Sequence, residues 1–220
     1  MRVTRTFRTM SSLLLLAALA VPALSGVPTE QVKETTEKIL EVVKDPALKG
    51  DDKAGERKRL IRVAADERFD WQEMARRSLG RHWRSLTDEE KEDFVALFSE
   101  LIGHSYLAKI QGYTGEGVRY EDEKVDDKYG VVETTIVTSK GVDIPVLYRL
   151  KNKGAEGGAL WLVYDVSIEG VSLVNNYRTQ FKAILSKSSH DELVEKLKAK
   201  LPKDEECKTD DESSASADSQ

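Results

Sequence analysis

Cysteine is nearly absent from this chain of 220 residues, and that shortage limits how the fold can be held together. Cys207 is the single cysteine, so no disulfide can form within one molecule. The fold must therefore be stabilised by burial of apolar side chains. Histidine is equally scarce, and His82, His104 and His190 stand far apart with no second ligand two to four residues away. Because a metal site needs converging ligands, the sequence predicts no bound metal.

The motifs of common catalytic sites are also missing. Residues 170–174 resemble part of a nucleophile elbow, but Val174 replaces the second glycine, so Ser172 is better explained as a helix N-cap. The glycines between 112 and 117 follow a predicted helix and not a strand, which excludes a dinucleotide-binding loop. The acidic residues 88–93 suit the start of a helix, where the helix dipole favours negative charge. None of these stretches predicts catalysis, and the composition predicts no cofactor.

An excess of basic charge is lacking as well. The whole chain carries −5, residues 1–25 carry +3, and residues 203–220 carry two Lys against seven acidic residues, or −5. The segment 26–202 is left with −3, which gives no basic footprint for nucleic acid. The acidic tail 203–220 has no apolar periodicity, so we expect it to be disordered.

The N-terminus has the features of a secretory signal. Arg2, Arg5 and Arg8 precede an apolar stretch, Leu13–Ala20, and small residues at Ala23 and Ser25 follow it. The stretch is short for a membrane span, although an uncleaved anchor is the alternative. We therefore predict a cleaved secretory signal peptide at 1–25 and one domain over 26–202.

Within that domain, helical periodicity comes first, strand periodicity second and helical periodicity last. The spacing predicts helices over 28–43, 58–67, 71–79 and 87–110, with Asp70 and Thr87 as N-caps. Alternation then predicts strands over 118–121, 131–138, 142–151 and 159–166, where Pro145 suggests an edge strand or a bulge. Two helices, 172–187 and 191–201, close the domain. Segregated elements of this kind predict an α+β fold with a meandering antiparallel sheet.

Several motifs together resemble one known family. The first is an aromatic-Asp-aromatic entry at Phe69–Trp71, and the second is an L-G-x-x-W turn at Leu79–Trp83. The third is an F-x-x-L-F helix at Phe94–Phe98, followed by Tyr106, and the fourth is an E-G-x-S helix start at Glu169–Ser172. The stretch Tyr164–Phe181, which joins the last long strand to a helix, carries the resemblance most fully. Each motif is weak alone, but their order and spacing resemble the MlaC-like toluene-tolerance auxiliary family. The tail after Leu201 lies outside the family pattern.

The resemblance implies a fold, a ligand and partners. It implies a curved antiparallel β-sheet wrapped by helices around a deep apolar pocket that takes the acyl chains of a glycerophospholipid. It also implies a monomeric periplasmic carrier of an ABC transport system that maintains outer-membrane lipid asymmetry. Such a carrier shuttles lipid between an outer-membrane lipoprotein–porin complex and an inner-membrane substrate-binding ring, and it is not itself an enzyme.

The apolar faces of the predicted elements, interpreted with this resemblance, give the expected lipid contacts: Phe98, Leu101, Tyr106, Ile144, Val146, Tyr148, Val163, Val166, Val171, Val174 and Tyr177. Periodicity alone fits an ordinary filled core equally well. Two alternatives for the function stay open. One is an enzyme for an apolar substrate, with Tyr106, Tyr148 or Asp165 as acid or base; the other is a periplasmic adaptor or chaperone that binds protein.

Overall fold

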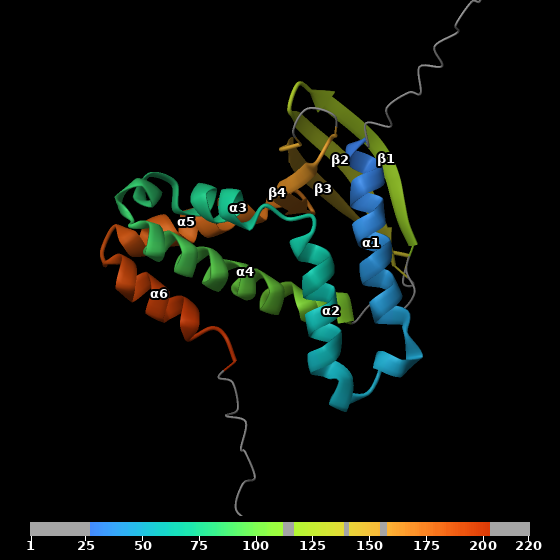
Figure 1. Cartoon of the computed structure of the whole chain (residues 1–220), viewed down its shortest axis with the longest axis horizontal. Coiled ribbons are helices and arrows are strands. Elements are labelled where there is room, and N and C mark those ends of the chain that lie inside the picture. Colours follow the sequence, from blue (N-terminus) through green and yellow to red (C-terminus); the bar gives the residue numbers. More distant parts are fainter. Residues whose placement is uncertain (1–26, 112–116, 139–140, 155–157, 203–220) are drawn as a thin grey trace, which may run out of the picture.

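The computed structural model describes residues 27–111, 117–138, 141–154 and 158–202, with 107–111 described in their backbone only. Its elements follow the predicted order of helices, strands and helices (Figure 1). The helices are α1 (Pro28–Lys44), α2 (Ala54–Asp66), α3 (Trp71–Leu79), α4 (Asp88–Gln111), α5 (Leu173–Leu185) and α6 (His190–Lys198). The strands are β1 (Gly117–Asp126), β2 (Tyr129–Val137), β3 (Asp143–Asn152), β4 (Trp161–Ile168) and β5 (Val171–Ser172). The predicted signal peptide and acidic tail lie outside the described residues.

The helix starts confirm the predicted caps. The Asp70 carboxylate accepts a hydrogen bond from the backbone N–H of Glu73, at 3.1 Å, and so caps α3. Thr87 and Glu90 form a reciprocal capping box, because each side chain accepts a hydrogen bond from the other's backbone N–H. These local contacts explain why the sequence placed both starts correctly.

All five strands form one antiparallel meander in the order β1-β2-β3-β4-β5. The register shifts between Tyr120 and Asp122 in β1, and again where β4 passes Arg149 and Leu150 of β3. Such bulges increase the local twist, so the sheet curls without closing into a barrel. This is the α+β fold with an antiparallel sheet that the sequence predicts.

Pro145 does not mark an edge strand or a bulge, which corrects the prediction made for it. β3 is the central strand, and its pairing with β2 runs regularly through Thr135 opposite Pro145. The carbonyl of Pro145 accepts a hydrogen bond from the Glu169 N–H in the β4–β5 turn, and pairing with β4 starts only at Val146. The missing N–H of Pro145 therefore falls just beyond the β3–β4 ladder, where no partner strand needs it.

The interior consists of two apolar clusters. In the helical cluster, α3, α4, α5 and α6 pack around Phe94, Phe98 and Phe181, and Figure 1 shows these helices gathered at one side of the molecule. In the sheet cluster, Val32 of α1 packs with residues of β2, β3 and β4. Tyr106 of α4 packs against both clusters. The sheet is thus covered on one face by α1, and we call this its inner face.

Candidate functional site

The inner face of the sheet is mainly apolar. In β3 it carries Ile144, Val146, Tyr148 and Leu150, the alternate residues that pack in the sheet cluster. The same cluster contains Val132 of β2 and Val163, Val166 and Ile168 of β4. Period-two alternation brings the β3 side chains to one side, since successive residues of a strand point to opposite faces. In β4, the register shift opposite Arg149 and Leu150 brings Val163 to the same side as Val166 and Ile168.

Along this face, the side chains are covered at one end of the sheet and exposed at the other. In β3, Leu150 has no exposed surface, Val146 is 5% exposed, Ile144 is half-buried, and Val142 just before the strand is 57% exposed. The larger Tyr148 is half-buried between Leu150 and Val146. The inner face is therefore sealed at the Leu150 end and open at the Val142 end.

The neighbouring strand repeats this gradient. Val163 has no exposed surface, Val166 is 5% exposed, Ile168 is half-buried, and Val171 of β5, which pairs with Ile168, is 57% exposed. The register places Leu150 opposite Val163 and Val146 opposite Ile168, so both strands open at the same end.

Half-buried apolar side chains also bound the open end from the other elements. β1 and β2 contribute Tyr120 and Ile136, which pack against the sheet cluster, and the C-terminal half of α1 carries the half-buried Ile39, Leu40, Val42 and Val43. Side chains in a completely filled core are close to zero exposure, as Val132 and Leu150 are here. Partial exposure on facing elements therefore indicates an apolar surface that the protein leaves incompletely covered.

Tyr148 lies deep in the protein although part of its surface stays accessible. Burial raises the pKa of its phenol to about 12, with a smaller contribution from the nearby Tyr120. Burial likewise raises the pKa of Tyr120 and of Tyr106. A deep side chain with accessible surface is typical of a residue that faces an internal space. All three phenols stay neutral at physiological pH.

The eleven residues expected to touch lipid do not form one surface. Phe98, Leu101, Val174 and Tyr177 belong to the helical cluster, where each is at most 8% exposed, so the structure packs them as core. Val146, Val163 and Val166 lie on the inner face with Ile144 and Tyr148, while Tyr106 connects the two clusters. Val171 lies at the open rim. The role of each as a lipid contact stays a prediction.

Other residues of the inner face escaped the sequence prediction. They are Tyr120, Ile136 and Ile168, which pack against the sheet cluster. Alternation of Val118 with Tyr120 was an available signal. It identifies the apolar face of the strand, but not which elements meet.

The three residues considered as a catalytic acid or base, Tyr106, Tyr148 and Asp165, do not form a common site. Asp165 is 7% exposed and lies on the outer face of the sheet, where its Oδ1 accepts a hydrogen bond from the Val174 N–H and its Oδ2 accepts one from the Ser172 hydroxyl. Arg149 lies 3.4 Å from the same Oδ2. Asp165 therefore fastens the start of α5 to β4, on the side of the sheet away from Tyr106 and Tyr148. The three groups do not converge.

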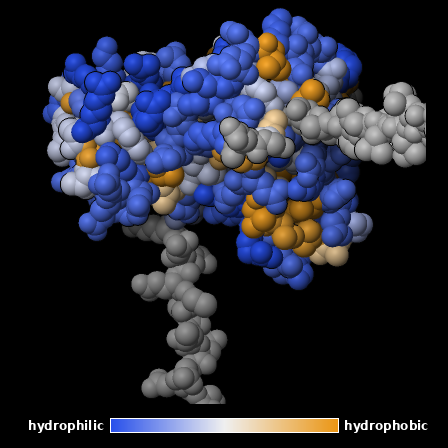
Figure 2. All heavy atoms as spheres, turned by 45° about the horizontal axis from the view of Figure 1, so that its top comes forward, coloured by the Kyte–Doolittle hydropathy of each residue, from blue (hydrophilic) through white to orange (hydrophobic). Residues whose placement is uncertain are grey.

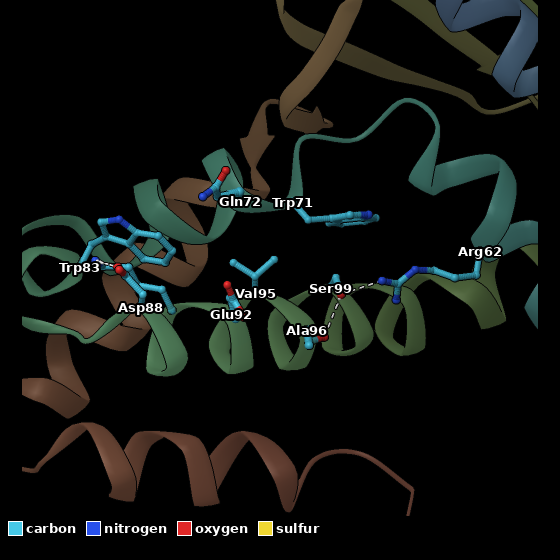
Figure 3. A pocket seen from close by; sticks show the side chains of 10 residues that line it. Arg62, Trp71, Gln72, Trp83, Asp88, Glu92, Val95, Ala96 and Ser99 are labelled. Atoms are coloured by element: carbon cyan, nitrogen blue, oxygen red, sulfur yellow. Dashed lines mark hydrogen bonds and ion pairs between the residues drawn. The ribbon is translucent and has the colours of Figure 1, made fainter. Parts of the chain in front are cut away.

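Two hollows elsewhere on the surface are unlike the inner face. One, of about 500 Å³, lies between α3 and α4; Figure 3 shows Trp71 and Trp83 at its two ends and Val95 between them. Arg62 stacks over Trp71 and donates a hydrogen bond to Ser99 across it. The other, of about 360 Å³, lies on the outer face between Glu133, Leu147 and Arg149. Both are shallow and have charged residues in their walls.

The visible surface is mainly polar. Figure 2 shows one face of the molecule, on which the hydrophobic side chains gather chiefly in one patch at the lower right. Within the part of the chain that the structure describes, no helix is both long enough and apolar enough to cross a bilayer. The same residues contain no group of three His, Cys, Asp or Glu side chains that could hold a metal ion.

An α+β fold with a mainly apolar inner face that is open at one end is the architecture of a binding protein for an apolar ligand. The family model described as MlaC protein matches residues 33–199. The chain therefore belongs to the MlaC family, whose members are binding and transport proteins and not enzymes.

Individual relatives agree with this assignment. The chain is 31% identical over 121 residues to the intermembrane phospholipid transport system binding protein MlaC of Haemophilus influenzae, covering 54% of this chain and 56% of that protein. It is 26% identical over 112 residues to the toluene tolerance protein ttg2D of Pseudomonas putida, covering 50% of each. The matched region thus spans about half the length of these curated relatives.

A solved structure supports the fold over more of the chain. It is the phospholipid-binding protein of Ralstonia solanacearum in complex with a phospholipid, with a TM-score of 0.69 and 26% identity, covering 77% of this chain and 94% of that one.

Proposed function

We propose that this protein binds a glycerophospholipid by its acyl chains against the inner face of the sheet. The observation that carries the proposal is the exposure gradient, from Leu150 and Val163 without exposed surface to Val142 and Val171 at 57%. A sealed apolar end takes chain termini, and an open end leaves the head group near solvent. The Ralstonia solanacearum neighbour, with the same fold, was solved with a phospholipid.

The energetics suit a carrier. Each methylene removed from water contributes about 0.8 kcal/mol, so two acyl chains supply a large transfer term without any polar recognition. The half-buried side chains around the open end are apolar or bear neutral hydroxyls, so they hold a charged head group weakly. Such a site accepts acyl chains of different kinds and can release the bound phospholipid to a partner.

We further propose that the protein works in the periplasm as the soluble carrier of an ABC transport system. The proposed partners are an outer-membrane lipoprotein–porin complex, from which it takes lipid or to which it delivers it, and an inner-membrane substrate-binding ring. The features of a signal at 1–25 and the similarity to a named intermembrane phospholipid transport protein support this role.

Lipid extraction and mass spectrometry of the purified protein test the binding step. We expect co-purified phospholipid, and uptake of labelled phospholipid from vesicles by protein stripped of its lipid. Protein that is lipid-free as purified and stays so after incubation with vesicles contradicts the proposal.

A matched pair of variants locates the site. Ile144→Asp places a charge on the inner face near the open end, whereas Leu147→Asp places one on the outer face of the same strand, where Leu147 is also half-buried. We expect Ile144→Asp to lose most lipid uptake and Leu147→Asp to keep it. Equal uptake by both variants would exclude the inner face as the site.

A further inference from the structure

We propose that Tyr148 sets the length of acyl chain that this protein accepts, because its ring ends the path that a chain can follow along the inner face. This inference rests on the proposed function. It adds a specificity-determining residue to the lipid site, and it follows from where the inner face stops being accessible.

Beyond Tyr148 the inner face is closed by packing. Leu150 pairs with Val163 and, like Val132 of β2, has no exposed surface. Val32 of α1 belongs to the same cluster and is 2% exposed. No accessible apolar surface continues past Tyr148 along β3.

The closed end of the inner face is packed still more tightly at Gly130 of β2, which pairs with Leu150 of β3. A methyl group added at Gly130 would meet Pro28 of α1 and Trp161 of β4 at 3.2 Å each. A larger residue would be tightly fitted there, because the N-terminus of α1 lies close to the sheet. The N-terminal half of α1 therefore seals this end of the inner face.

Tyr148 has a larger side chain than its neighbours on the two adjacent strands. In the register it lies between Val132 of β2 and Val166 of β4, which are small and at most 5% exposed. A bulky ring between two buried valines adds volume to the inner face that neither neighbour has, and its phenol lies close enough to Thr134 of β2 to form a hydrogen bond. It is also a deep residue, since burial raises the pKa of its phenol to about 12.

The distance to the open end matches one acyl chain. Tyr148 lies six residues after Val142, and at about 3.3 Å per residue this spans roughly 20 Å. Half of the hydrocarbon core of a bilayer, the depth that one leaflet's chains fill, is about 15 Å. Ile144, four residues before Tyr148, lies roughly 13 Å from it on the same scale. A chain whose head-group end lies between Val142 and Ile144 therefore reaches the Tyr148 ring close to its terminus, where a change of ring size acts on chain length directly.

The test compares Tyr148→Ala with Tyr148→Phe. Lipid-free protein is incubated with vesicles that contain equal amounts of phospholipids with one head group and short, intermediate or long saturated chains. Mass spectrometry then gives the chain lengths of the captured lipid. We expect Tyr148→Ala to shift the captured lipid to longer chains, and Tyr148→Phe, which keeps the ring, to match the unchanged protein. Tyr148→Leu, a smaller deletion, replaces Tyr148→Ala if circular dichroism shows that the latter does not fold.

The outcomes separate this inference from the proposed function. If every variant captures lipid with the same chain lengths, Tyr148 is not the limit, while lipid binding stands. A shift in Tyr148→Phe as large as in Tyr148→Ala overturns the inference too, because it assigns the effect to the hydroxyl. If the unchanged protein captures no lipid, the proposed function fails, and the inference fails with it.

Discussion

The Ser172 hydroxyl donates a hydrogen bond to Asp165 Oδ2 at 2.7 Å and accepts one from the backbone N–H of Asn175 at 3.0 Å. One serine therefore caps α5 and ties it to β4, as the prediction of an N-cap at Ser172 required. Asp165 Oδ1 accepts the Val174 N–H as well, at 3.1 Å. Strand, turn and helix are joined by a single buried carboxylate, which gives Asp165 a structural role.

Asp165→Ala should lower the free energy of unfolding by about 1–3 kcal/mol, because it leaves the Val174 N–H and the Ser172 hydroxyl without their acceptor. Urea unfolding followed by circular dichroism measures the loss. Asp143→Ala is the control: its ion pair with Arg119 is half-exposed, so we expect a loss of at most about 1 kcal/mol. Equal losses for the two variants would show that the Asp165 contacts contribute no more than a surface ion pair.

Glu73 should make stability depend on pH in the acid range. Hydrogen bonds from Arg76, with Arg77 adding to them, lower the pKa of the carboxyl to about 2 against the opposing effect of its burial. A lowered pKa stabilises the fold fully above the unfolded value of about 4.5, and the contribution is lost as pH falls toward 2. Since both arginines are partly exposed, the loss should be roughly 1–2 kcal/mol.

Unfolding curves of the protein and of Glu73→Gln, recorded at several pH values, check this expectation. The variant should be less stable near neutral pH, and the gap should close as pH falls from 4.5 toward 2. A gap that stays constant over this window would assign the pH dependence to other carboxyls.

The sequence predicted well what depends on neighbours along the chain. The caps at Asp70, Thr87 and Ser172 are contacts across three residues, and alternation alone placed Ile144 and Tyr148 on one face. The order of elements and the α+β class followed from the same local signals.

What the sequence did not show depends on tertiary placement. Alternation puts Val163 and Val166 on opposite faces, and only the bulge where β4 passes Arg149 and Leu150 brings both inward. Phe98 and Tyr148 look alike as apolar residues on amphipathic elements. They differ in the cluster that they join: Phe98 is fully buried among α3–α6, whereas Tyr148 is half-buried on the sheet.

Arg68 should be among the most sensitive positions outside the apolar clusters. Its guanidinium is buried and donates hydrogen bonds to Gln31 Oε1 at 2.5 Å, to the Trp161 carbonyl at 2.9 Å and to the Thr35 hydroxyl at 3.2 Å. Burial lowers its pKa. These hydrogen bonds hold the N-terminal half of α1 against β4, at the sealed end of the inner face.

Arg68→Ala should therefore cost about 2–4 kcal/mol of unfolding free energy, since three acceptors lose a charged donor and a cavity forms. The exposed Arg59→Ala on α2 should change stability by less than about 0.5 kcal/mol. Thermal unfolding of both variants measures the difference. A small effect at Arg68 would mean that apolar packing alone seats α1.

Two glycines should respond to alanine in opposite directions. Gly103 lies inside α4, and a methyl group there would meet no atom within 4 Å. Because glycine costs roughly 1 kcal/mol against alanine in a helix, Gly103→Ala should stabilise the protein by up to that amount. Gly80 ends α3 with φ of +60°, a conformation that side chains with a Cβ rarely adopt, and Arg178 lies 3.4 Å from where the methyl would stand. Gly80→Ala should therefore destabilise by about 1 kcal/mol or more. Urea midpoints that move the same way in both variants would contradict this assignment, because backbone strain at Gly80 and helix propensity at Gly103 demand opposite signs.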